Sequence, residues 1–202
     1  MKLIVMTQPT FFVEEDKIIA SLFDEGLDAL HLYKPGSSPM YSERLLTLLD
    51  EDICSKITVH GNFYLKEEYK LRGIHIDDAT TPPPRGYRGH ISRTCTQLDN
   101  LKETKKNADY VFLKYIFDSQ TEPDQRACFT ESELKEASRH GVIDKHVYAL
   151  GGMNLETIRQ AKELGFGGVV ISGDLWNRFN IHQELDYQEL IDHFKKLRKA
   201  VS

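Results

Sequence analysis

The sequence has few cysteines, no long apolar run and no excess of positive charge. Its three cysteines, Cys54, Cys95 and Cys128, form neither a CxxC pair nor a zinc-binding spacing, and we interpret them as structural. No apolar run approaches the roughly 20 residues that a membrane-spanning helix requires. The apolar residues 3–6 are too few for a secretory signal. We therefore expect a reduced, cytoplasmic protein that contacts no membrane.

The charge balance is slightly acidic, with 26 lysines and arginines against 31 aspartates and glutamates and a pI near 5.9. Nucleic-acid binding requires a basic face, so we expect no nucleic-acid partner. Any anionic ligand must instead be held by local groups. The 202 residues are 40% hydrophobic and 28% charged, an ordinary globular composition that suits one domain over residues 1–202.

Short apolar runs alternate with amphipathic stretches along the whole chain. The runs are residues 3–6, 29–33, 57–60, 74–76, 90–92, 110–113, 146–150 and 168–173. They are too apolar to expose one face, which is typical of strands in a buried parallel sheet. Eight such units predict a compact α/β fold, the (β/α)8 TIM barrel. A doubly wound sheet is the rival, but no Rossmann fingerprint follows an early strand.

Helices are predicted between these strands, over residues 14–25, 64–71, 97–106 and 187–199 among others. Ser42, Thr130 and Asn154 are the expected N-caps, and Thr130 with Glu133 makes a capping box. The three prolines at 82–84 exclude an ordinary helix after the fourth strand.

Two glycine-containing turns follow the seventh and eighth strands. They contain Gly151 and Gly152 in the first and Ser172 and Gly173 in the second. Barrels of this kind hold their active site at the carboxyl ends of the strands, with phosphate bound after strands 7 and 8. Glycine lets backbone N–H groups approach an anion, and although a tight turn alone can require it, its presence after both strands favours a phosphate site.

Several motifs in series resemble the thiamine phosphate synthase family. Residues 148–154 (YALGGMN) and 165–172 (GFGGVVIS) are similar to that family's AIGGI…GADGVAVVS signature. Weaker similarities to its GADYV, GVHLGQ and IGVS motifs lie at residues 108–111, 73–76 and 90–92. The family includes the synthase and a TenI-like branch that isomerises the thiazole precursor.

The resemblance implies an enzyme of thiamine biosynthesis that joins a pyrimidine diphosphate to thiazole phosphate and releases diphosphate. It implies that Gly151, Gly152, Ser172 and Gly173 hold the thiazole phosphate and that Ser92 contacts the diphosphate. Mg²⁺ is the cofactor if the protein is a synthase, since the leaving group needs its charge neutralised. A homodimer is a further expectation.

The chain departs from the family where diphosphate and metal are bound. His31 and Tyr33 replace a glutamine and an arginine, and Lys34 lies one place before the expected lysine. Gly61 and Thr80 replace two aspartates, so Asp77 and Asp78 are the remaining metal candidates. After the sixth strand, Lys114 begins a segment that lacks the family's final lysine.

These departures leave further interpretations open. A tautomerase needs no metal, only a phosphate anchor and acid–base groups, for which His31 and His60 at neighbouring strand ends are candidates. Lys34 and Lys114 would then face the anion. The same histidines with Asp77 and Asp78 would also suit Zn²⁺ or Fe²⁺, and a non-catalytic phosphate-binding barrel is a third interpretation. We expect His75 inside the barrel. Four other histidines are expected at the surface: His140, His146, His182 and His193.

Overall fold

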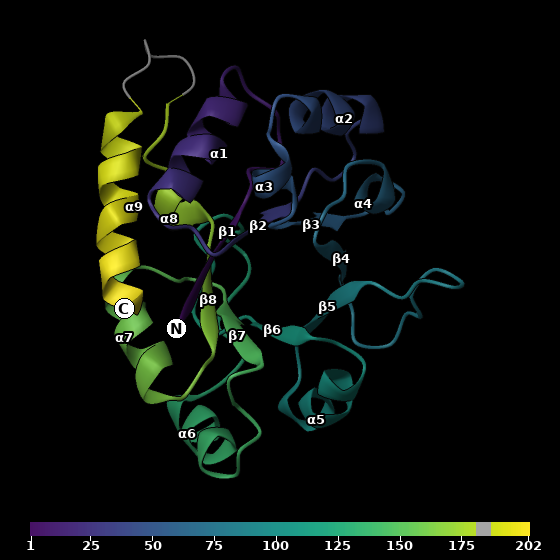
Figure 1. The fold of residues 1–202 in the computed structure, drawn as a ribbon. Helices are drawn as coiled ribbons and strands as arrows, with labels where there is room; N and C mark the ends of the chain where they lie inside the picture. Colours follow the sequence, from purple (N-terminus) through teal and green to yellow (C-terminus); the bar gives the residue numbers. More distant parts are fainter. Residues whose placement is uncertain (181–186) are drawn as a thin grey trace.

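Eight parallel strands close into a barrel in the order of the sequence in the computed structural model, which describes residues 1–180 and 187–202 (Figure 1). The strands are β1 Lys2–Met6, β2 Ala29–Leu32, β3 Ile57–His60, β4 Gly73–Ile76, β5 His90–Cys95, β6 Tyr110–Lys114, β7 Val147–Leu150 and β8 Gly168–Ile171. Pairing of β1 with β8, with Val5 opposite Ile171, closes the ring. The predicted (β/α)8 barrel is confirmed.

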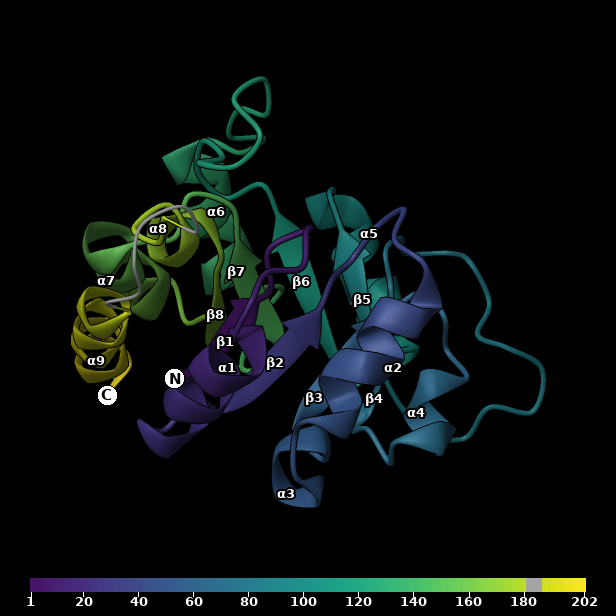
Figure 2. The same ribbon diagram turned by 90° about the horizontal axis from the view of Figure 1, so that it is seen from above.

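Helices lie around the outside of the barrel, and among the described residues only the connection from β4 to β5 contains no helix (Figures 1 and 2). They are α1 Glu15–Asp24, α2 Pro39–Thr47, α3 Glu51–Cys54, α4 Leu65–Glu68, α5 Leu98–Lys106, α6 Glu131–Arg139, α7 Leu155–Glu163, α8 Gly173–Trp176 and α9 Gln188–Val201. The proline-rich segment between β4 and β5 contains no helix, as predicted, and forms a loop that extends away from the barrel (Figure 2). Among the described helices, none has the length and apolar character to cross a membrane.

The helix caps follow the sequence in two of three cases. Thr130 Oγ1 accepts the N–H of Glu133 at 3.2 Å, which confirms the capping box before α6. Asn154 caps α7 through its side chain. The predicted cap at Ser42 is wrong, because Pro39 begins α2 one turn earlier, with Ser38 as N-cap. Ser42 is a buried residue within that helix.

Side chains alternate along each strand between the helix layer and the barrel interior. A separate apolar cluster fills the interior: Ile4, Ala29, Tyr110, Phe112, Tyr148, Leu150 and Val170. These residues come mainly from β6, β7, β8 and β1. The opposite half of the interior, from β2 to β5, contributes buried polar side chains: His31, Thr58, His75, Ser92 and Thr94.

The histidines and cysteines match the sequence predictions only in part. His75 is buried in the interior as predicted, and His140 and His146 are exposed. The surface prediction for His193 is wrong, because α9 turns this residue toward α8, where its Nε2 lies 2.6 Å from Asp174 Oδ2. His182 lies outside the described residues. Two of the cysteines are buried, whereas Cys128 is exposed.

Candidate active site

A pocket of about 340 Å³ lies at the carboxyl ends of the strands. All eight strands contribute a lining residue at or near their ends: Met6, Tyr33, His60, Asp77, Thr94, Lys114, Leu150 and Val170. Because parallel strands of a closed barrel all end at the same rim, side chains distant in sequence converge here. This is the position of the active site in enzymes with this fold.

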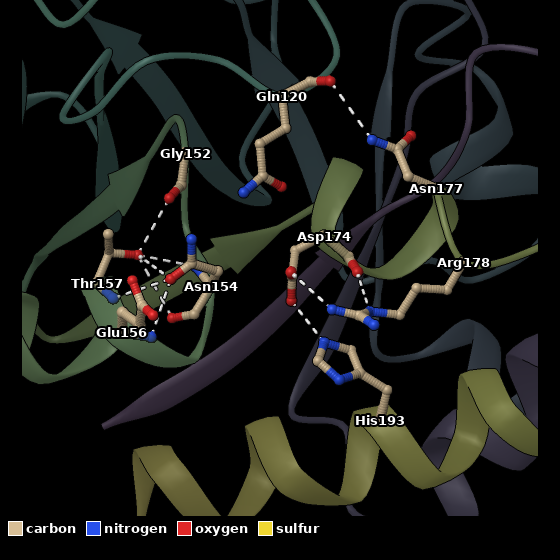
Figure 3. Close-up of polar contacts among 9 residues, drawn as sticks. All are labelled: Gln120, Gly152, Asn154, Glu156, Thr157, Asp174, Asn177, Arg178 and His193. Carbon is tan, nitrogen blue, oxygen red and sulfur yellow. Dashed lines mark hydrogen bonds and ion pairs between the residues drawn. The ribbon is translucent and has the colours of Figure 1, made fainter.

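All four residues predicted to hold a phosphate line this pocket: Gly151, Gly152, Ser172 and Gly173. Figure 3 shows Asn154 accepting hydrogen bonds on Oδ1 from the backbone N–H groups of Glu156 and Thr157, at 2.9 and 3.0 Å. The first turn of α7 is thus capped by its own side chain. An anion bound here would therefore accept hydrogen bonds from the N–H groups of the glycine turn that precedes Asn154, and not from those of Glu156 and Thr157.

The glycine turn after β8 is held in place by a contact with helix α9. Asp174, next to Gly173 at the start of α8, accepts a hydrogen bond from His193 and pairs with Arg178 Nη2 at 3.5 Å (Figure 3). Asn177 Nδ2 donates to the carbonyl of Gln120 at 3.4 Å, which joins α8 to the loop after β6. These contacts hold the turn after β8 in one position at the rim.

The loop after β6 contributes a part of the pocket that the sequence predictions did not identify by residue. Four consecutive residues of this loop line the pocket: Ser119, Gln120, Thr121 and Glu122. A Cβ added to Gly173 would lie 2.8 Å from Gln120 Cβ and 2.9 Å from Thr121 Cγ2. The loop is therefore packed directly on the glycine turn. The signal in the sequence was the long polar segment that follows Lys114.

Lys114 is the only lysine or arginine among the described residues that line the pocket. Its Nζ lies 3.9 Å from Glu122 Oε1 and 4.3 Å from the centre of the Tyr115 ring. Tyr115 donates a hydrogen bond to Glu122 Oε2 at 2.7 Å. Burial, followed by this carboxylate, raises the pKa of the Tyr115 hydroxyl. Positive charge in the pocket thus depends on one side chain, beside two carboxylates, Asp77 and Glu122.

Lys34, in contrast, lies away from the pocket lining in a buried ion pair. Its Nζ contacts Glu15 Oε1 at 2.5 Å and donates to the carbonyl of Thr10 at 2.8 Å. Burial lowers the pKa of Lys34 and raises the pKa of Glu15, because desolvation disfavours both charges. In this position Lys34 fixes the segment between β1 and α1.

A chain of hydrogen bonds runs from the pocket into the barrel. Asp77 Oδ1 lies 3.0 Å from His60 Nδ1, and His60 Nε2 lies 2.8 Å from His31 Nδ1. His31 Nε2 lies 2.6 Å from the hydroxyl of Tyr110. His31 is fully buried, and burial, followed by the charge of His60, places its pKa well below 6.5. His60 and Asp77 line the pocket, whereas His31 lies one layer beneath them.

His75 and Ser92 form a second buried polar contact below the pocket. His75 Nδ1 lies 2.7 Å from Ser92 Oγ, and its Nε2 lies 2.8 Å from Thr94 Oγ1. Ser92 is fully buried because β5 continues to Cys95, so the strand ends three residues later than the sequence predicted. Thr94, the next inward-facing residue of β5, reaches the pocket in its place.

The two predicted metal-binding carboxylates differ in orientation. Asp77 lines the pocket with a side chain that is 65% exposed, so it has room for a further ligand. Asp78 Oδ1 accepts the N–H groups of Thr80 and Thr81 and lies outside the lining. Nitrogens of His31, His60 and His75 lie within 4.8 Å of one another. Each nitrogen of these three rings has a hydrogen-bonding partner in the protein, so a Zn²⁺ or Fe²⁺ ion would have to displace such bonds.

The fold and the pocket together define a (β/α)8-barrel protein with a ligand pocket at the carboxyl ends of its strands. The model of the thiamine monophosphate synthase family matches residues 43–175, more than half of the chain, and the protein belongs to this family. It is a thiamine phosphate synthase-like member, and the family is a transferase family of thiamine biosynthesis that generally uses Mg²⁺.

Relatives and solved structures are consistent with this assignment. A thiamine-phosphate synthase of Flavobacterium johnsoniae is 24% identical over 85% of this chain and 87% of its own. Another, of Caldivirga maquilingensis, is 34% identical over 51% of this chain and 52% of its own, about half of that relative. The crystal structure of a thiamine phosphate pyrophosphorylase from Bacteroides thetaiotaomicron has 48% identity, covers 99% of this chain and 97% of its own, and superposes with a TM-score of 0.90.

Proposed function

We propose that this protein is a thiamine phosphate synthase-like enzyme that joins a pyrimidine diphosphate to thiazole phosphate. The bond between the pyrimidine methylene carbon and the diphosphate oxygen breaks, and the thiazole nitrogen forms a bond to the same carbon. The observation that supports this proposal is the convergence of both glycine turns, Lys114 and Asp77 on one pocket. The turns would hold the thiazole phosphate, and Lys114 would face the negative charge of the diphosphate.

The pocket is compatible with a magnesium ion held mainly by the substrate. Mg²⁺ usually binds one or two carboxylates, several waters and substrate phosphates. Asp77 supplies one exposed carboxylate at the rim, opposite the turns after β7 and β8 in the closed ring. When bound, the ion would neutralise charge on the departing diphosphate. Asp78 would join it only if the turn through Thr80 and Thr81 opened. A diphosphate would meet Thr94, while Ser92 lies beneath it.

A direct assay tests this proposal. The protein is incubated with the pyrimidine diphosphate, thiazole phosphate and Mg²⁺, and thiamine phosphate is measured by chromatography. We expect product that depends on both substrates and is lost with a chelator. The absence of product above a no-enzyme control would refute the synthase reaction.

A second reaction, isomerisation of the thiazole phosphate, is favoured by the hydrogen bond between His60 and Asp77. A hydrogen-bonded imidazole–carboxylate pair in a ligand pocket is suited to acid–base chemistry. His31 would hold His60 in place through its hydrogen bond, and Lys114 and the glycine turns would bind the phosphate. Lys34 would hold the segment between β1 and α1 at the rim through its ion pair with Glu15. The assay supplies the unisomerised thiazole phosphate without metal.

If neither reaction proceeds, a phosphate-binding role without catalysis is the remaining interpretation. Thiazole phosphate or thiamine phosphate would then raise the melting temperature without being converted, because a ligand that binds only the folded state stabilises it. Phosphorylated small molecules are the expected partners in all three cases. The expected homodimer stays a prediction, which sedimentation at micromolar concentrations would test.

A further inference from the structure

The hydrogen-bond chain from Asp77 to Tyr110 has one consistent direction when the imidazoles are neutral. An ionised carboxylate only accepts hydrogen bonds, so His60 Nδ1 must carry the proton that is shared with Asp77 across 3.0 Å. A neutral imidazole has one donor and one acceptor, so His60 Nε2 accepts from His31 Nδ1. His31 Nε2 is then the acceptor for the Tyr110 hydroxyl.

This direction determines what His60 can offer to a ligand. Its Nδ1–H points to Asp77, and its Nε2 faces His31, which is fully buried. Neither nitrogen is free to take a proton from a molecule in the pocket. The Asp77 carboxylate, in contrast, lines the pocket and has a side chain that is 65% exposed.

We propose that Asp77 exchanges protons with the ligand and that His60, His31 and Tyr110 are positioning residues, which hold a fixed N–H donor against this carboxylate. The inference rests on the isomerisation reaction, the second candidate function above. Asp77 removes a proton from one atom of the thiazole phosphate, and the electrons of that bond shift into the ring system. The same proton returns to another atom, so no oxidant, reductant or leaving group is involved.

The surroundings of His60 keep its ring in this orientation. His75 stacks on it with ring centres 4.2 Å apart and planes inclined by 18°. His75 is itself fixed by Ser92 and Thr94. The Tyr33 ring, which follows β2, lies edge to face against the His60 ring, with ring centres 5.4 Å apart. Turning the ring out of this plane to expose a basic nitrogen to the pocket would break these contacts as well as two hydrogen bonds.

The tautomers can be measured without any substrate. In protein with ¹⁵N-labelled histidine, long-range ¹H–¹⁵N spectra distinguish Nδ1–H from Nε2–H imidazoles. At a pH where both rings are neutral, we expect His60 and His31 in the Nδ1–H form. We expect the fixed form of His60 to be lost in Asp77→Leu, whose side chain cannot accept a hydrogen bond, and to persist in Asp78→Leu. An Nε2–H form of His60 in the wild-type protein, or an unchanged form in Asp77→Leu, would overturn the proposal.

Kinetics then separate proton transfer from positioning. We expect Asp77→Asn to abolish isomerisation, and Tyr110→Phe to lower kcat about tenfold with little change in KM. Tyr148→Phe is the matched control. The Tyr148 ring stacks on the Tyr110 ring inside the barrel, with ring centres 4.6 Å apart, but Tyr148 is not part of the hydrogen-bond chain from Asp77 to Tyr110. Full isomerisation by Asp77→Asn, or equal losses in both tyrosine variants, would overturn the assignment. If the wild-type protein does not isomerise, the second candidate reaction and the proton transfer both fail. The tautomer spectra then show whether the positioning chain itself exists.

Discussion

Gly152 is a residue at which backbone conformation and packing both require glycine. Its φ is +64°, and an added Cβ would lie 2.5 Å from the carbonyl oxygen of Asp118. From the sequence, glycine is expected at this position because it lets backbone N–H groups approach an anion. The structure shows that a side chain would first meet the protein's own loop. The loop after β6 is therefore part of the reason for this glycine.

We predict that Gly152→Ala destabilises the protein and weakens binding of thiazole phosphate, because the loop must move. Gly141→Ala is the control, since Gly141 has a φ of +67° with nothing within 4 Å of the added Cβ. Both variants carry a backbone cost of roughly 1–3 kcal/mol. Only Gly152→Ala should lose affinity in titration calorimetry. Equal affinity in Gly152→Ala and the parent would contradict a phosphate site at this turn.

Lys114 is the second residue whose role can be tested alone. A hydrogen bond to a charged group contributes about 1.5–3 kcal/mol, so Lys114→Met should weaken binding of phosphorylated ligands roughly tenfold or more. Lys135→Met on α6 serves as control, because Lys135 pairs with Glu131 at the exposed surface. If both variants bind thiazole phosphate like the parent, Lys114 does not face the anion.

The N-cap of α7 contacts the glycine turn of the pocket through Thr157, whereas the N-cap of α6 forms its hydrogen bonds with its own helix. Replacing a capping side chain by alanine costs about 1 kcal/mol. Thr130→Ala and Asn154→Ala should therefore lower the free energy of unfolding by similar amounts. Asn154→Ala should also weaken ligand binding, because Thr157, which Asn154 fixes, donates to the carbonyl of Gly152 at 3.1 Å. Unfolding in urea and calorimetric titration measure the two effects, and equal binding by both variants would separate the α7 cap from the site.

Features that depend on neighbouring residues could be predicted from the sequence. The apolar runs identified all eight strands, and the Thr130–Glu133 spacing identified the start of α6. The glycine turns were expected at the pocket because they follow the last two strands. Local pattern was insufficient for α8, whose four residues carry no periodicity.

Features that depend on distant residues could not be predicted. Lys34 pairs with a carboxylate 19 positions away, and α9 buries His193 against α8. The chain from Asp77 to Tyr110 joins residues of β2, β3 and β6 with the end of β4, and requires the inward register of each. From the sequence, His31 and His60 are expected at one rim, whereas in the structure His60 lines the pocket and His31 lies beneath it. These contacts arise from the closure of the barrel.

The whole molecule should lose stability in acid because it buries neutral histidines. The pKa values of fully buried His31 and His75 lie well below their usual 6.5. Below pH 6.5 the unfolded chain binds protons at these positions that the folded chain does not bind, so stability falls as the pH falls. Each histidine should contribute a slope of about 1.4 kcal/mol per pH unit between its unfolded and folded pKa values.

Urea unfolding between neutral pH and pH 5 tests this prediction. His75→Gln should reduce the slope by the share of one histidine. His140→Gln, which changes an exposed residue, should leave the slope unchanged. A stability that does not depend on pH in this range would show that these histidines are not buried in neutral form.

The contact between the loop after β6 and the two glycine turns makes three separate segments interdependent. Gln120 and Thr121 fill the space that a side chain at Gly173 would need, and Asp118 does the same at Gly152. Grafting the loop of a relative onto this barrel would therefore succeed only when the turns after β7 and β8 are transferred with it. The natural unit of exchange for altering ligand preference in this protein is this group of three segments.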